Sequence, residues 1–204
     1  MKNIIIDTDP GVDDAVALLY ALSLPKDINC LLVSLTFGNV SLRQCFCNLY
    51  TILDVAHKQG LLDGKTIPVA CGQDKPLFSS ETVDAAHFHG GDGLGGMHKT
   101  HAEYTPQGWE DVFSGASQPD SGKGFSILDR PADQEILHLL QSHEEDSITI
   151  VAIGPLSNVA KAAIADPQTF SRVAEVVVMG GCIDTVGNAN PFAEFNTFAD
   201  PEGC

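Results

Sequence analysis

Residues 3–22 read NIIIDTDPGVDDAVALLYAL and place two patterns side by side in the chain. The run at 4–6 is short and wholly apolar, which is typical of a strand buried on both faces. From Asp13 onward, apolar residues recur at helical spacing as far as Leu22, and this predicts a helix. The loop between the two patterns therefore lies at the carboxyl end of a strand.

That loop concentrates negative charge, because it carries Asp7, Asp9, Asp13 and Asp14. Like charges at partly buried sites repel strongly, and the usual remedies are a raised pKa or a bound cation. With no basic residue nearby and only oxygen ligands, the loop favours a hard cation, Ca²⁺ or Mg²⁺, over zinc. In the alternative interpretation Asp13 and Asp14 only cap a helix and favour its dipole, which leaves Asp7 and Asp9 unexplained.

Short apolar runs alternate with helical patterns along the chain. Strands are expected at residues 4–6, 30–36, 67–70, 148–153 and 176–179. Helices are expected at residues 13–22, 42–57, 131–143 and 158–164. Such alternation predicts an α/β fold with a mostly parallel central sheet flanked by helices. Ligands bind beyond the carboxyl ends of the strands in such sheets, so the acidic loop, Gly38-Asn39 and Gly154-Pro155 should share one edge.

The chain of 204 residues is long enough for one sizeable domain, and we expect residues 1–204 to form a single one. Residues 105–123 lie in a stretch rich in Gly, Ser, Pro and Asp, and we interpret them as an exposed loop insertion. Residues 196–202 have the pattern of another helix start, with Asp200 as N-cap and Pro201 at the first position. We therefore interpret the chain as incomplete at its C-terminus.

Composition argues against several classes of partner. The net charge is −16, and the 11 Lys and Arg residues are scattered, so neither nucleic acid nor an anionic membrane surface is expected to bind. No apolar run approaches a membrane span, and Asp7 and Asp9 interrupt the first one, which argues against a signal peptide. The six cysteines are dispersed, and we interpret them as free thiols of a cytoplasmic protein.

Two further segments carry side chains suited to a ligand. Residues 188–196, NANPFAEFN, combine Asn and Glu groups that bind hydroxyls such as those of a sugar, and a turn-rich surface loop is the alternative. Residues 86–96, AHFHGGDGLGG, are rich in glycine but lack the Lys-Ser/Thr ending and the preceding strand of a phosphate-binding loop. They are either a flap that carries His89 toward a ligand or a mobile loop with two solvated histidines.

Taken together, these motifs resemble the inosine-uridine-preferring nucleoside hydrolase family. The resemblance is carried by residues 7–15 (DTDPGVDDA), 37–39 (FGN), 89–94 (HGGDGL), 154–158 (GPLSN), 178–181 (VMGG) and 187–196 (GNANPFAEFN). The first motif is highly specific, and the ordered set spans nearly the whole chain. The resemblance implies the Rossmann-like nucleoside hydrolase fold, here without its C-terminal part.

The resemblance also implies an activity, which is hydrolysis of the N-glycosidic bond of purine or pyrimidine ribonucleosides to ribose and a free base. It implies Ca²⁺ as cofactor, with Asp9, Asp14 and the backbone carbonyl of Ile153 as ligands and Asp7 in or next to the ligand shell. Asp9 would also be the base that activates a Ca²⁺-bound water. The implied substrate contacts are Asp13, Asn39, Asn188, Glu194 and Asn196 at the ribose hydroxyls, Met179 in the ribose pocket and His89 near the base.

The chain departs from the family pattern in two ways. Members of the family are longer, and their additional part carries a His-Asp pair that completes the Ca²⁺ site and, in many members, helps to protonate the leaving base. The insertion at 105–123 is also longer than in the shorter bacterial and protozoan members. Because relatives are commonly dimers or tetramers, a homo-oligomer is a further expectation.

Two other interpretations remain open at this point. One is a truncated form of the same fold that binds ribosides without turning them over, or is inactive. The other is a phosphatase of the haloacid dehalogenase type, which also places Asp-x-Asp after its first strand and binds Mg²⁺. Against the phosphatase, Gly11 stands where Thr or Val is usual, and Asp13-Asp14 does not fit that pattern.

Overall fold

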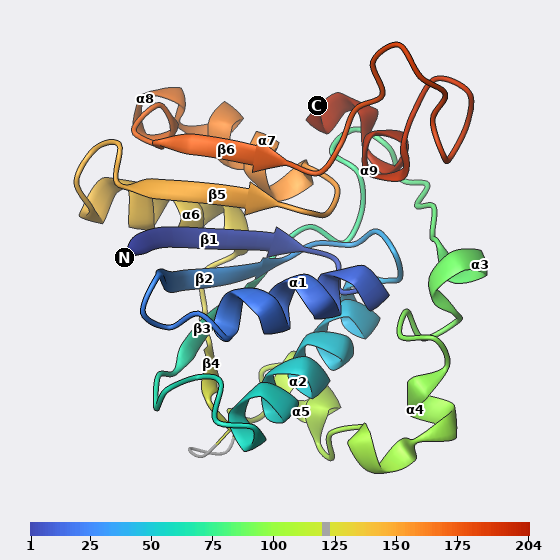
Figure 1. Ribbon diagram of the computed structural model, residues 1–204. Coiled ribbons are helices and arrows are strands. Elements are labelled where there is room, and N and C mark those ends of the chain that lie inside the picture. Colours follow the sequence, from blue (N-terminus) through green and yellow to red (C-terminus); the bar gives the residue numbers. More distant parts are fainter. Residues whose placement is uncertain (120–122) are drawn as a thin grey trace.

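A computed structural model describes residues 1–119 and 123–204. The described residues form a six-stranded sheet in the order β4-β3-β2-β1-β5-β6, and every neighbouring pair is parallel (Figure 1). The strands are β1 (Lys2–Thr8), β2 (Ile28–Leu35), β3 (Ile67–Cys71), β4 (Phe125–Ile127), β5 (Ile148–Ala152) and β6 (Glu175–Val178). The expected α/β fold with a parallel sheet is confirmed.

Helices cover both faces of this sheet. The longer ones are α1 (Val12–Leu22), α2 (Leu42–Lys58), α6 (Ala132–Ser142) and α7 (Ser157–Ala165). The shorter ones are α3 (Ala86–His89), α4 (Met97–Thr100), η1 (Ala102–Tyr104), α5 (Trp109–Phe113), α8 (Pro167–Phe170), α9 (Phe195–Ala199) and η2 (Pro201–Gly203). Helices α1 and α2 lie over one face, and α6 and α7 lie over the other (Figure 1). No helix in the described part of the chain has the length and apolarity needed to cross a membrane.

Strand β1 is buried on both sides because its side chains alternate between two cores. Ile4 and Ile6 pack into the core under α1 and α2, whereas Ile5 packs into the core under α6 and α7. Successive side chains of a strand point to opposite faces, so an unbroken apolar run is what a central parallel strand requires. The apolar run that opens the sequence therefore becomes the middle of the molecule.

Two expectations about the less regular segments need correction. Strand β4 has only three residues and was not among the expected strands. The insertion at 105–123 is only partly exposed, because it contains α5, where Val112 is buried and the Phe113 ring lies 5.3 Å from that of Phe46. Residues 120–122 of that insertion lie outside the described residues. One helical turn packed by two apolar side chains is too short to show periodicity in sequence.

The expectation at residues 196–202 is confirmed in position, because Asp200 precedes a helical turn that begins at Pro201, but it is corrected in detail. Helix α9 already occupies Phe195–Ala199, and Pro201 begins the short turn η2. The Asp200 side chain does not cap that turn. It is buried and accepts hydrogen bonds from the Leu77 backbone N–H and the Ser157 hydroxyl. Long-range partners have thus displaced the local capping bond that the sequence suggested.

Strand β6 differs from β1 because it is an edge strand with an open face. Val177 and Val178 are 45% and 43% exposed. An apolar groove of about 360 Å³ lies between α1 and this end of the sheet, with Tyr20, Val151 and Val177 among its lining residues. No helix of the described residues covers this face of β5 and β6 (Figure 1).

Candidate active site

The carboxyl ends of β1, β2, β5 and β6 meet at one edge of the sheet, where the structure forms a cavity of about 650 Å³. Most of the side chains singled out in the sequence line this cavity. They are Asp13, Asp14, Asn39, His89, Ile153, Met179, Asn188, Glu194 and Asn196. Asp7 and Asp9 do not line it, because both are fully buried behind its wall. The expected grouping at one edge is therefore found, with two carboxylates deeper than the others.

Asp9 is the most constrained of the four carboxylates. Its Oδ2 accepts a hydrogen bond of 2.7 Å from the Asn39 backbone N–H, and its Oδ1 has no partner among the described residues. Two glycines make room for it. A β-carbon on Gly38 would lie 2.0 Å from Oδ2, and one on Gly154 would lie 2.8 Å from Oδ1. The loops after β2 and β5 therefore need glycine at these positions so that a carboxylate fits between them.

Asp14 sits beside Asp9 and is also buried. Its Oδ1 accepts from the Thr8 hydroxyl at 2.6 Å, and its Oδ2 accepts from the Gly11 backbone N–H at 3.1 Å. The Asn39 side-chain amide joins the two acids, since its Nδ2 donates to Asp14 Oδ2 and to the Asp9 carbonyl oxygen. The bond to Gly11 means that Asp14 does cap α1. The capping interpretation thus accounts for part of the role of Asp14 and for none of Asp9.

Burial and repulsion oppose the charges of this group. Burial raises the pKa of Asp9 well above its usual value, and the Asp14 charge raises it further. Burial likewise raises the pKa of Asp14. Burial raises the pKa of Asp7 to about 6, although hydrogen bonds from Asn158 and Ser34 act to lower it. Three buried carboxylates with raised pKa values form a site that favours a proton or a cation.

The oxygen-rich chemistry of this group fits a hard cation. Asp9 Oδ1 is buried and without a partner among the described residues. The ion pairs of those residues join neither Asp9 nor Asp14 to a Lys or Arg. The described residues hold no cluster of three His, Cys, Asp or Glu side chains arranged to bind a metal ion. A cation here would therefore use carboxylates together with other oxygen donors.

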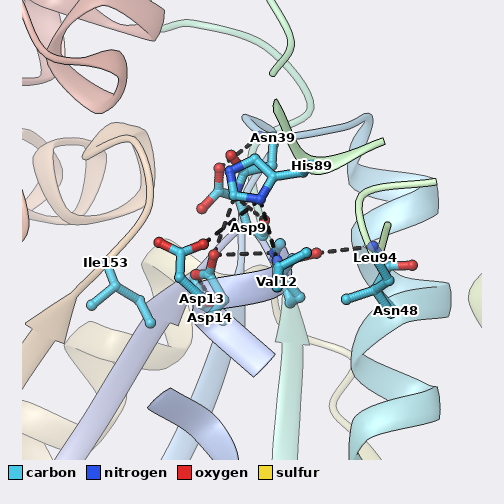
Figure 2. Close-up of polar contacts among 12 residues, drawn as sticks. Asp9, Val12, Asp13, Asp14, Asn39, Asn48, His89, Leu94 and Ile153 are labelled. Carbon is cyan, nitrogen blue, oxygen red and sulfur yellow. Dashed lines mark hydrogen bonds and ion pairs between the residues drawn. The ribbon is translucent and has the colours of Figure 1, made fainter. Parts of the chain in front are cut away.

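The loop around α3 brings His89 to the acidic loop. His89 is only 7% exposed, and its Nδ1 accepts a hydrogen bond of 3.3 Å from the Val12 backbone N–H. Its Nδ1 also lies 3.8 Å from Asp13 Oδ1, and Figure 2 shows the imidazole among the aspartates and Asn39. The alternative of two solvated histidines is wrong for His89, whose ring is packed against Gly11.

The opposite side of the cavity is formed by residues 188–196 and Met179. Glu194 caps α9 by accepting from the backbone N–H groups of Asn196 and Thr197. Burial acts to raise the pKa of Glu194, but hydrogen bonds from Thr197, Asn196 and Gly181 outweigh it and hold the pKa below its usual value. The Asn196 side-chain amide donates to the carbonyls of Ile153 and Met179 at 3.0 and 2.9 Å. Asn188 is exposed at the rim.

We call these two sides the acidic wall (residues 7–14 with Asn39) and the Asn/Glu wall (residues 188–196). Two buried amides that support the acidic wall were not identified from the sequence. Asn158 donates to Asp7 Oδ1 at 2.8 Å, and Asn48 donates to the Pro10 carbonyl at 2.9 Å. Asn48 falls on the apolar stripe of α2, and a polar residue on such a stripe is the signal that would have marked it.

Comparison with known proteins gives consistent matches over the chain. A family model described as inosine-uridine preferring nucleoside hydrolase matches residues 4–204. A protein of that name from Leishmania major is 39% identical over 100% of this chain and 55% of its own length. A solved plant nucleoside hydrolase superposes with a TM-score of 0.76 at 32% identity, covering 99% of this chain and 55% of that chain. A solved inosine-guanosine nucleoside hydrolase gives a TM-score of 0.77 at 32% identity, and the match covers 100% of this chain and 56% of that chain. The chain thus spans about half the length of the relatives it matches.

Proposed function

This chain belongs to the inosine-uridine preferring nucleoside hydrolase family, and from that premise we propose that the protein hydrolyses the N-glycosidic bond of ribonucleosides to ribose and a free base. The observation that carries the proposal is the Asp9 carboxylate. It is fully buried, has an oxygen without a partner among the described residues, and is hydrogen-bonded to Asn39, which lines a cavity of about 650 Å³. A buried carboxylate with an oxygen left free to accept a proton, beside a ligand cavity, suits a general base.

We propose Asp9 and Asp14 as the carboxylate ligands of a Ca²⁺ ion. The Ile153 carbonyl would be a further ligand, and Asp7 would support the group from behind. The raised pKa values of Asp9 and Asp14 show that burial disfavours their charged forms. A bound cation would offset this cost, because it favours the charged form of a neighbouring carboxylate. When bound, Ca²⁺ would lower the pKa of a water molecule and attract the oxygens of the sugar.

The chemistry asked of the chain itself is proton transfer and charge stabilisation. Asp9 would accept the proton of the attacking water, and its hydrogen bond from the Asn39 backbone N–H would keep the carboxylate in position. Departure of the base leaves a sugar with oxocarbenium character, as in glycoside hydrolysis. The carboxylates of Asp13 and Asp14 line the cavity, and they would stabilise this positive charge as it develops.

The remaining lining residues would hold the substrate. We propose that Asp13, Asn39, Asn188, Glu194 and Asn196 bind the ribose hydroxyls. Met179 would pack against the sugar and His89 would lie near the base. These residues come from four separate loops that converge on the cavity. Holding the sugar at several hydroxyls fixes the anomeric carbon in line with the attacking water, and such positioning is a large part of catalysis.

The class of base, the location and the assembly are parts of the same proposal. Relatives are named for inosine and uridine, for uridine, or for inosine and guanosine, so we propose a ribonucleoside substrate with either a purine or a pyrimidine base. We propose a cytoplasmic location because all six cysteines are free. We also propose a homo-oligomer, either a dimer or a tetramer.

A second candidate is a riboside-binding form of the same fold without turnover. One observation favours it, which is that the cavity is lined by Asn and Glu side chains that can bind hydroxyls whether or not a reaction follows. In this form the acidic wall would still hold Ca²⁺ and a ribose. Such a protein would bind ribose in calorimetry with Ca²⁺ present and release no base.

The test is to incubate the protein with inosine and with uridine in the presence of Ca²⁺ and to measure reducing sugar. Ribose release from either nucleoside supports the proposal, and an Asp9→Asn variant controls for contaminating activity. If no ribonucleoside is hydrolysed, the proposal is wrong. Phosphate release from a simple phosphomonoester by the same preparation would favour the phosphatase interpretation instead.

A further inference from the structure

Asn48 is a fully buried amide in the middle of α2, and its side chain uses every hydrogen-bonding position it has. Its Nδ2 donates to the Pro10 carbonyl at 2.9 Å and to the Asp92 carbonyl at 2.8 Å. Its Oδ1 accepts from Gln44 Nε2 at 3.0 Å and lies 2.9 Å from His98 Nε2. An Asn side chain offers two donors and two lone pairs, so nothing is left unpaired.

Through these bonds Asn48 joins two segments that are far apart in sequence. Pro10 follows Asp9 in the acidic loop, and Asp92 lies in the loop that follows His89. The approach is close, because a β-carbon on Gly93 would lie 2.8 Å from Asn48 Nδ2. Figure 2 shows Asn48 reaching from α2 toward the acidic loop on the side away from Ile153. One amide thus sets the spacing between the two loops.

The loop held by Asn48 is hydrogen-bonded within itself and to His89. The Asp92 carboxylate accepts hydrogen bonds from the backbone N–H groups of Leu94, Gly96 and His98. The Gly95 backbone N–H donates to the His89 carbonyl oxygen at 2.7 Å. A displacement of Asp92 would therefore carry the backbone of His89 with it.

The position of His89 decides which of its ring nitrogens carries the proton. The Val12 backbone N–H can only donate, and Asp13 Oδ1 lies 3.8 Å from His89 Nδ1, which is too far to accept a hydrogen bond from it. His89 Nδ1 therefore accepts the bond of 3.3 Å from Val12 and is unprotonated in the neutral ring. The proton of the neutral ring is then on Nε2. His89 lines the cavity, so in this tautomer its ring offers a donor to a bound ligand.

We propose that Asn48 is a positioning residue that holds His89 against the start of α1 and thereby keeps its neutral ring in the Nε2–H tautomer. The expected effect of Asn48 on turnover rests on the proposed function. The expected effect of Asn48 on the position and tautomer of His89 does not. Without the amide, the loop at Asp92 loses its bond to α2. The Val12 to His89 contact then loosens, and the ring becomes free to exchange tautomers.

The experiment compares Asn48→Ala with Thr51→Val. Thr51 is a matched control, because it is also buried on α2. Its hydroxyl donates to the carbonyls of Cys47, on the same helix, and of Tyr104, in η1, and neither residue lines the cavity. Nitrogen-15 NMR of the imidazole side chains at neutral pH reports the tautomer of His89, which is assigned from the signal lost in His89→Gln. We expect an Nε2–H pattern in the wild type and in Thr51→Val, and an averaged pattern in Asn48→Ala.

Turnover gives the second measurement. We expect kcat/KM for a nucleoside to fall roughly 10- to 100-fold in Asn48→Ala and less than about threefold in Thr51→Val, because small misplacements of a positioned group are costly. Should Asn48→Ala fail to fold, Asp92→Ala removes the three hydrogen bonds that the Asp92 carboxylate accepts within the same loop, and it should move the His89 signal in the same direction. A folded variant of either kind that keeps the wild-type His89 pattern overturns the proposal. Absence of turnover in the wild type would refute the proposed function alone, since the NMR comparison still decides the role of Asn48.

Discussion

The two walls of the cavity are held by different kinds of contact. In the acidic wall, Asp9 and Asp14 are fixed by Asn39 from another strand end, and Pro10 is fixed by Asn48 from α2. In the Asn/Glu wall, Glu194 bonds mainly to its own neighbours, Asn196 and Thr197, and Phe192 is 89% exposed. The acidic wall is therefore part of the core, whereas the Asn/Glu wall is a locally folded loop joined to it chiefly through Asn196.

This difference separates the expected effects of mutation. Changes in the acidic wall should alter catalysis, cation binding or folding, because Asp7, Asp9 and Asp14 are buried and are held by groups from other elements. Changes in the Asn/Glu wall should alter substrate affinity and leave the fold intact.

Asp9→Asn removes the proposed base and should lower kcat for nucleoside hydrolysis by roughly 1,000-fold, within the range known for general bases. Thermal stability should not fall, because the variant replaces a fully buried carboxylate with a neutral group of the same shape. Steady-state kinetics and calorimetric melting of the same preparation test both statements. A variant with a tenth or more of the wild-type kcat would exclude Asp9 as the base.

Gly38→Ala tests the close packing behind the acidic wall. The new β-carbon would lie 2.0 Å from Asp9 Oδ2, and we expect a loss of about 1–3 kcal/mol in the free energy of unfolding. Gly91→Ala is the control, because no atom lies within 4 Å of its added β-carbon, and it should change stability by less than about 0.5 kcal/mol. Urea denaturation measures both. If both variants change the free energy of unfolding equally, the Asp9 carboxylate is not packed against Gly38.

The raised pKa of Asp7 predicts how stability depends on pH. The folded value of about 6 lies above the usual 3.8, so the folded state binds more protons between these pH values and stability falls as pH rises through that window. In protein stripped of divalent cations the loss should approach about 3 kcal/mol by pH 7. Asp7→Asn should flatten the curve. Denaturation curves from pH 4 to pH 7 with the same slope in both proteins would contradict the assignment.

Glu194→Gln addresses the Asn/Glu wall. The carboxylate accepts from Gly181, Asn196 and Thr197, and an amide can serve these donors with only one oxygen. We expect KM to rise roughly tenfold with a much smaller change in kcat, because Glu194 is proposed to bind a ribose hydroxyl and its own orientation is set by these donors. Circular dichroism should remain unchanged. A large fall in kcat with constant KM would show instead that Glu194 acts in catalysis, as we expect of the acidic wall.

Phe192→Ala should have the smallest effect. The side chain is 89% exposed, so its removal should change the free energy of unfolding by less than about 0.5 kcal/mol. We expect kcat to change less than about twofold, because the side chain does not line the cavity. If kcat or KM shifts tenfold, residues 188–196 contact the substrate more extensively than the structure indicates.

The same contrast explains how far the sequence alone could lead. Five of the six strands and the four longer helices follow from apolar periodicity, since each pattern is local. The edge that gathers Asp14, Asn39 and Glu194 follows from the rule that parallel strands share a carboxyl end. The buried amides that hold this edge in place could not be predicted from the sequence. Asn48 bonds to residues 38 and 44 positions away, and Asn158 bonds to a residue 151 positions away, and no local pattern records such partners.

Product analysis of inosine hydrolysis in water enriched in the heavy oxygen isotope shows whether a water molecule attacks the sugar. If a water activated by Asp9 attacks the sugar, early product should be ribose that carries the heavy isotope at its anomeric carbon together with unlabelled base. Asp9→Asn should form neither product at a comparable rate. Products that appear only when phosphate is added, or unlabelled ribose at the earliest times, would contradict the account.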